Sequence, residues 1–133
     1  MNILVSVDEG FLRPLKIMLL SMSKSNKDVD VYLLYSSLSE ASIAGLDKFC
    51  LDSCGGYKLH PINASGFFEG VPLSKQYPKV ELYFRLAAAH ILPKSVERIL
   101  YMDADIVVQG SLKELYELDL QGHPIALTSD RYY

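Results

Sequence analysis

The segment Ile99-Leu-Tyr-Met-Asp-Ala-Asp-Ile-Val-Val108 places two carboxylates, Asp103 and Asp105, inside an otherwise apolar run. The residues before them, 98–102, predict a buried strand. Side chains two positions apart on extended backbone share a face, so we expect both carboxylates to point the same way. Repulsion and desolvation disfavour two ionised carboxylates side by side, and a divalent cation removes both penalties. The segment therefore predicts a strand end that carries a site for Mn²⁺ or Mg²⁺.

Helix and strand patterns alternate outward from this segment. Short apolar runs predict further strands at residues 3–7, 30–35, 57–62 and 125–128. Helical spacing and cap signals predict helices at 12–22, at Ser39 to Gly55, at Pro78 to Ile91, and after the capping box Ser111-Leu-Lys-Glu114. Residues 63–77 are predicted to form a long loop. This alternation is typical of an α/β fold, a Rossmann-like three-layer sandwich with a mostly parallel sheet.

Length and composition exclude several classes of protein. The 133 residues suit a single domain over 1–133, and a hydrophobic content of 50% excludes general disorder. The net charge is −3 and no basic stripe is present, which excludes nucleic-acid binding. No apolar stretch reaches the roughly 20 residues of a membrane span, and the start has no basic leader, so we expect a cytoplasmic protein. Cys50 and Cys54 lack zinc-site spacing and are expected to be buried thiols.

Acidic residues follow three of the predicted strands. Asp8 follows the first, Asp103 and Asp105 the fourth, and Asp130 the last. Parallel sheets bind ligands beyond the carboxyl ends of their strands, so we expect these carboxylates at one edge. The alternative for Asp8 is a helix cap. The alternative for the pair is a turn-capping aspartate beside an exposed one.

Four segments together resemble one known family. The segment 100–112, Leu-Tyr-Met-Asp-Ala-Asp-Ile-Val-Val-Gln-Gly-Ser-Leu, resembles the D-x-D signature of family 8 retaining glycosyltransferases, which include bacterial galactosyl- and glucosyltransferases and glycogenin. The segment 2–11 is similar to that family's first strand and nucleotide loop, and 81–86 to its arginine-bearing helix. The segment 113–120 also fits. These segments occur in family order over nearly the whole chain.

The resemblance implies a GT-A fold and transfer of a hexose, with retention, from a UDP-sugar to a saccharide or glycan acceptor. It implies Mn²⁺ or Mg²⁺ held by Asp103 and Asp105. It also implies contacts to the nucleotide by Val7, Asp8, Phe11, Arg85 and Ala104, and to the sugar by Asp130. Gly10 departs from the asparagine that is usual in the family, which removes one expected contact to the nucleotide.

The resemblance does not extend to the family's later segment, which supplies a histidine metal ligand and a lysine for the diphosphate. The chain therefore resembles the N-terminal, nucleotide-sugar-binding part of a truncated GT-A domain, and no catalytic residue is assigned. We expect the isolated chain to have little transferase activity. A truncated sheet is also expected to expose an edge and to form homo-oligomers.

Two other functions remain as alternatives. A phosphatase of the haloacid dehalogenase type also uses D-x-D, as a nucleophile and an acid/base. That motif normally continues to a threonine, where this chain has Val107, and normally opens the chain. The other alternative is a nucleotide-binding module without turnover.

Overall fold

The structure, a computed structural model, describes residues 1–76 and 79–127. Its centre is a sheet of four parallel strands in the order β3-β2-β1-β4. The strands are β1 (Asn2–Ser6), β2 (Asp30–Tyr35), β3 (Lys58–Asn63) and β4 (Leu100–Tyr101). The predicted α/β fold with a parallel sheet is confirmed.

The two central strands, β1 and β2, are apolar and buried in their middle residues, where both faces of the sheet are covered. Successive side chains of a strand point to opposite faces. Ile3 and Val5 of β1 therefore join one core cluster, whereas Leu4 joins the cluster on the other face. Val31 and Leu34 of β2 divide in the same way. Burial on both faces explains the continuous apolar runs in the sequence.

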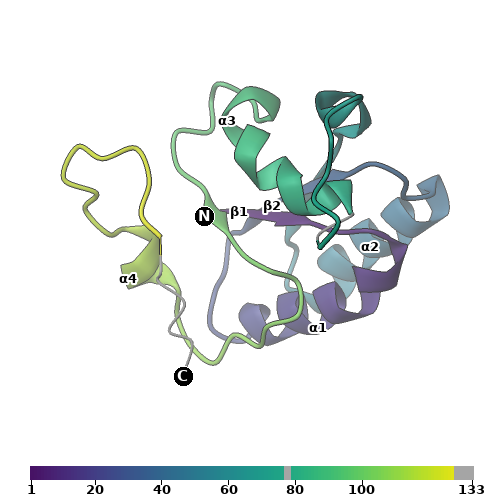
Figure 1. Ribbon diagram of the computed structural model, residues 1–133. Helices are drawn as coiled ribbons and strands as arrows, with labels where there is room; N and C mark the ends of the chain where they lie inside the picture. The colour runs from purple at the N-terminus through teal and green to yellow at the C-terminus, as the bar shows by residue number, and fades with distance from the viewer. Residues whose placement is uncertain (77–78, 128–133) are drawn as a thin grey trace.

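Two helices, α1 (Leu12–Ser23) and α2 (Glu40–Ser53), cover one face of the sheet (Figure 1). A short 3-10 helix, η1 (Glu9–Phe11), leads from β1 into α1. Pro14 lies in the first turn of α1, where a missing N–H removes no helical hydrogen bond. The predicted cap of α2 is confirmed, because Ser39 Oγ accepts a hydrogen bond from the Ser42 amide at 3.1 Å.

Both cysteines are free thiols buried in the core on this face. Burial raises the pKa of Cys50 to about 12 and that of Cys54 to about 11. These thiols stay protonated at neutral pH, which confirms the prediction of buried, structural cysteines. Among the described helices, none is long and apolar enough to cross a membrane.

The opposite face is covered by η3 (Val80–Ala87), a 3-10 helix, and α3 (Ala88–Ile91) (Figure 1). The prediction of one α-helix from Pro78 to Ile91 is therefore wrong over most of its described part; Pro78 lies outside the described residues. Tertiary contacts override helix propensity here, because Phe84 is fully buried against the sheet. The predicted end is confirmed: Leu92, before Pro93, has extended backbone.

The predicted loop 63–77 contains a further 3-10 helix, η2 (Ser65–Phe68). The ring centroids of Phe68 and Phe84 lie 6.0 Å apart, and this aromatic contact stabilises η2 against η3. The rest of the described loop, residues 69–76, has no helix or strand, as predicted; Tyr77 lies outside the described residues.

The segment after the carboxylates also differs from the prediction. The last described helix, α4 (Lys113–Tyr116), begins after its N-cap residue Leu112, whose side chain makes no cap hydrogen bond. The predicted capping box is wrong, because Ser111 Oγ instead accepts from the amide of Lys113, only two residues away. The strand predicted at 125–128 is not formed over its described part, since residues 125–127 pair with no described strand. Thr128 lies outside the described residues.

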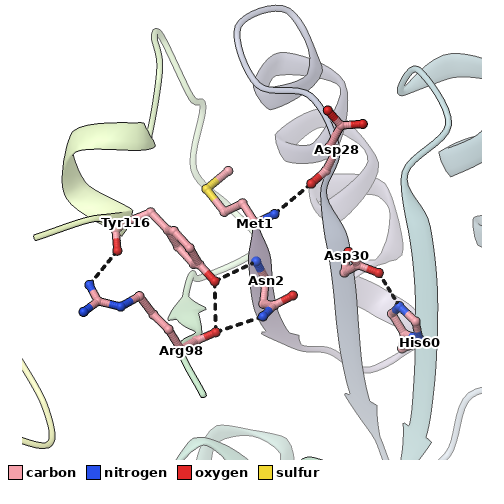
Figure 2. A network of polar contacts seen from close by, with 7 residues as sticks. All are labelled: Met1, Asn2, Asp28, Asp30, His60, Arg98 and Tyr116. Atoms are coloured by element: carbon pink, nitrogen blue, oxygen red, sulfur yellow. Dashed lines mark hydrogen bonds and ion pairs between the residues drawn. The ribbon is translucent and has the colours of Figure 1, made fainter. Parts of the chain in front are cut away.

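A polar network fixes α4 against the amino ends of β1 and β4 (Figure 2). The Tyr116 hydroxyl donates to the Arg98 carbonyl at 3.0 Å and accepts from the Asn2 amide at 3.2 Å. The Arg98 guanidinium donates to the carbonyl oxygens of Tyr116 and Leu118, each at 2.7 Å. After the two carboxylates, the chain therefore returns to the end of the sheet at which β1 and β4 begin. β4 is shorter than predicted, since only Ile3 and Leu4 of β1 pair with it.

Candidate metal and nucleotide site

The candidate site lies where β1 and β4 end side by side. Leu4 of β1 is opposite Tyr101 of β4, and the two strands are parallel. Asp8 follows β1 and Asp103 follows β4, so both leave the same edge of the sheet. The sequence predicted this arrangement from the rule that parallel strands present their carboxyl ends together.

Asp103 is held by two neighbours. Its Oδ1 accepts from the Tyr101 hydroxyl at 2.7 Å and from the Arg85 guanidinium at 3.3 Å. The side chain of Asp103 is still 56% exposed, so its carboxylate remains open to a ligand. Asp105 is exposed, and within the described part of the chain its carboxylate has no hydrogen-bond or ion-pair partner. One carboxylate is therefore oriented and the other is free.

The backbone around the pair differs from the prediction. Ala104 and Asp105 lie in a turn, so the argument from extended backbone is wrong. The turn follows β4 directly because that strand ends at Tyr101. Ala104 is buried in the core at 6% exposure, whereas the residues on both sides of it are exposed. The buried methyl group leaves both carboxylates on the solvent side of the turn.

Arg85 reaches Asp103 from η3, across the end of the sheet. Its guanidinium carbon lies 4.3 Å from the centroid of the Tyr101 ring, and its Nε donates to the Leu82 carbonyl at 3.0 Å. Burial, and then the hydrogen bond to Asp103, raise the pKa of Tyr101 above its ordinary value. The tyrosine therefore stays a protonated donor. Sequence reasoning identified Arg85 but missed Tyr101, whose place two residues before Asp103 was the available signal.

Asp8 caps η1 and binds a lysine. Its carboxylate accepts from the Phe11 amide at 3.2 Å, so Asp8 caps η1, and it forms an ion pair with Lys79; its contact with a nucleotide stays a prediction. The Lys79 ammonium also lies 5.4 Å from the centroid of the Phe11 ring. Lys79 had no signal in the sequence, because it lies 71 residues away from Asp8 along the chain. Asp8, Phe11 and Lys79 form a second polar cluster at this edge.

The structure limits what Val7 and Gly10 can contribute to a nucleotide site. The Val7 side chain is 2% exposed and packs in the core, which leaves only its backbone to a ligand. At Gly10, an added Cβ would lie 3.2 Å from a carboxylate oxygen of Asp8, so a side chain there would crowd that carboxylate. Asp130 lies outside the described residues.

Serine and glutamate side chains fix the helices around this edge. Ser6 Oγ, at the end of β1, donates to the Glu81 carbonyl at 2.7 Å, and Ser36 donates to the Glu81 carboxylate. The Glu9 carboxylate accepts from the amide of Ser39, the cap of α2, at 3.0 Å. These contacts hold η3 and α2 against the strand ends. Sequence reasoning missed all of them.

Asp103 and Asp105 fit a cation whose coordination is completed by ligands from outside the chain. Carboxylate oxygens are the ligands that Mg²⁺ and Mn²⁺ prefer, and such sites commonly use one or two carboxylates with water and phosphate oxygens. Among the described residues, no group of three or more histidine, cysteine or acidic side chains is placed to hold a metal ion. Asp103 and Asp105 could therefore supply only part of the coordination of a cation, and other ligands would have to supply the rest.

The Asp8–Lys79 ion pair predicts a pH-dependent contribution to stability. The hydrogen bond from Lys79 lowers the Asp8 pKa below its ordinary 3.8, so the contact stabilises the fold above that pH and is lost as pH falls through the lowered pKa. Lys79→Met should lower the free energy of unfolding at pH 7 by about 0.5 kcal/mol, since the lysine is half exposed. Urea unfolding of both proteins at pH 7 and pH 3 measures this. A difference that is unchanged at pH 3 contradicts the assignment.

Solved structures with the same fold are glycosyltransferases of the GT-A class. The galactosyltransferase LgtC, solved in complex with donor and acceptor sugar analogs, matches with a TM-score of 0.75 and 25% identity over 90% of this chain and 43% of that chain. The fold is therefore the GT-A fold that the sequence predicts. The glycosyltransferase GlyE of Streptococcus pneumoniae matches with a TM-score of 0.66 at 19% identity.

The chain belongs to glycosyl transferase family 8, whose sequence profile matches residues 2–133. The glycosyltransferase GlyF of Streptococcus pneumoniae is 29% identical over 98% of this chain and 32% of its own length. The lipopolysaccharide 1,2-glucosyltransferase of Escherichia coli K12 is 25% identical over 98% of this chain and 38% of its own length. The chain thus spans about a third of the length of these relatives.

Proposed function

We propose that this chain is the nucleotide-sugar-binding part of a metal-dependent glycosyltransferase that moves a hexose from a UDP-sugar to a saccharide acceptor, with retention. The observation that carries the proposal is the half-exposed Asp103, held by Arg85 and Tyr101 beside the free Asp105 at the carboxyl edge of the sheet. Membership of glycosyl transferase family 8 supports the reaction class.

Asp103 and Asp105 would hold Mn²⁺ or Mg²⁺, and the oxygens of the donor diphosphate and water would complete its coordination. A cation held there would supply positive charge beside a departing nucleoside diphosphate. Tyr101 and Arg85 orient the Asp103 carboxylate. Because the guanidinium carries five N–H donors, Arg85 has donors left for the diphosphate or the sugar.

The nucleoside would lie toward Asp8 and Phe11. The Phe11 side chain is 40% exposed, which leaves part of its ring open to a uracil base. The Asp8 carboxylate is an acceptor for the uracil imide N–H, although it is bound to Lys79 in the free chain. Val7 would contribute through its backbone, Ala104 through close approach of the turn, and Asp130 on the sugar side.

The test is a calorimetric titration of the 133-residue chain with UDP, in the presence of Mn²⁺ and again in EDTA. The proposal expects binding with Mn²⁺, much weaker binding in EDTA, and loss of the metal effect in Asp105→Ala. Binding that ignores both the metal and the substitution would instead indicate a nucleotide-binding module of another kind. Phosphate release from a phosphate monoester would favour the phosphatase alternative.

A further inference from the structure

The Asp103–Asp105 turn is fixed on both sides by contacts to other elements. Before the turn, the Met102 amide donates to the Leu4 carbonyl of β1 at 3.0 Å. After the turn, the Val108 amide donates to Ser21 Oγ on α1 at 2.9 Å. Met102 and Val108 are both buried in the same core cluster. The turn therefore lies between two anchored residues that are close in sequence: Met102 is held by β1 and Val108 by α1.

A buried asparagine just beyond the end of α1 fixes the chain further on. Asn26 is 6% exposed; its Oδ1 accepts from the Leu112 amide at 2.8 Å, and its Nδ2 donates to the Gly110 carbonyl at 3.1 Å. Nδ2 also donates to the Met22 carbonyl of α1 at 3.0 Å. The carbonyl of Asn26 in turn accepts from the buried Tyr57 hydroxyl at 2.9 Å. One side chain thus joins α1 to the segment that follows the carboxylates.

We propose that Ser21 and Asn26 are positioning residues, which hold the Asp103–Asp105 turn in the geometry that a cation and a diphosphate need. This inference rests on the proposed function. The two carboxylates repel each other when no cation is present, and a free turn would relieve that repulsion by opening. Anchors at 102, 108, 110 and 112 oppose such opening. A site placed by locked neighbours binds more tightly than one that must be ordered on binding.

The chain offers a matched control two residues from Ser21. Both Ser21 and Ser23 donate their hydroxyl to a helix carbonyl three residues earlier, at 2.7 Å and 2.9 Å. Only Ser21 also accepts from the Val108 amide. Ser21→Ala and Ser23→Ala therefore remove the same helical contact and differ in the contact to the segment after the turn.

The experiment measures Mn²⁺-dependent UDP affinity, amide hydrogen exchange at residues 103–106, and the free energy of unfolding for both variants. We expect Ser21→Ala to bind roughly three- to tenfold more weakly than Ser23→Ala, the factor for one ordinary hydrogen bond, with faster exchange at 103–106. Ser21→Thr, which keeps a hydroxyl, should restore both. Asn26→Asp places an acceptor against the Gly110 carbonyl and should accelerate the same amides.

Three results would overturn the inference. Equal affinity in the Ser21 and Ser23 variants is the first. Faster exchange without any loss of affinity is the second, because it describes a structural anchor only. The third is unchanged exchange at 103–106 in Ser21→Ala, which overturns the inference even if the wild-type chain binds no Mn²⁺–UDP. Absence of binding in the wild type is a failure of the proposed function, and is seen before any variant is compared.

Discussion

Asp103→Asn is expected to weaken Mn²⁺-dependent UDP binding by about 100-fold, because one of the two proposed cation ligands loses its charge. Changes to residues that only support a metal ligand cost about 10- to 100-fold, so a ligand should reach the upper end of that range. The asparagine keeps an oxygen that accepts from Tyr101 and Arg85, which leaves the local hydrogen bonds in place. Calorimetry with UDP at saturating Mn²⁺ measures the loss.

Asp52→Asn is the matched control for this variant. The Asp52 side chain is 58% exposed and ion-paired to Lys48, and that of Asp103 is 56% exposed and ion-paired to Arg85. Asp52 lies in the last turn of α2, at the edge opposite the candidate site, because α2 runs antiparallel to the strands it connects. Its substitution should leave UDP affinity unchanged. A similar loss in both variants would indicate an effect of net charge and not of a metal site.

Phe84→Ala is expected to lower the free energy of unfolding by about 3–5 kcal/mol, the range for removing a fully buried phenylalanine. Phe84 is 0% exposed and belongs to the core cluster beneath η3, with Leu4, Tyr32, Leu34 and Ala64. This is a large part of the roughly 5–15 kcal/mol that stabilises a typical domain. Urea unfolding followed by circular dichroism measures the change.

Leu86→Ala, on the same helix η3, is the control for Phe84→Ala. Leu86 is 74% exposed, so its removal should change the free energy of unfolding by no more than about 0.5 kcal/mol. Equal destabilisation by the two substitutions would contradict the placement of η3. Phe84 packs η3, which carries Arg85, against the sheet, so Phe84→Ala should also weaken Mn²⁺-dependent UDP binding, whereas Leu86→Ala should not.

Repeating patterns made the core of the fold predictable from the sequence. The apolar runs of β1 and β2 and the alternation of strands with helices predicted the parallel sheet, because strands buried on both faces must be continuously apolar. The cap Ser39 was predictable because a helix N-terminus needs a local acceptor. The positions of Asp8 and Asp103 followed from the sheet, since parallel strands end at one edge.

The parts that were missed depend on contacts between distant residues. Local pattern predicted an α-helix from Pro78 to Ile91, but residues 80–87 form a 3-10 helix, in which Phe84 is buried and Glu81 contacts Ser6 and Ser36. The pairing of Asp8 with Lys79 leaves no local trace. At Ser111 a local motif was present but misleading. Its hydroxyl accepts a hydrogen bond from the amide of Lys113, which is nearer than the amide that a capping box uses.

Crystals of the chain grown with UDP and Mn²⁺ test directly whether Asp103 and Asp105 hold the cation. Anomalous diffraction is collected at a wavelength where manganese scatters strongly. We expect one anomalous peak within bonding distance of carboxylate oxygens of Asp103 and Asp105, about 2.0–2.3 Å, and in contact with the UDP diphosphate. Bound UDP with no peak at these carboxylates, or with the manganese held elsewhere on the chain, would contradict it.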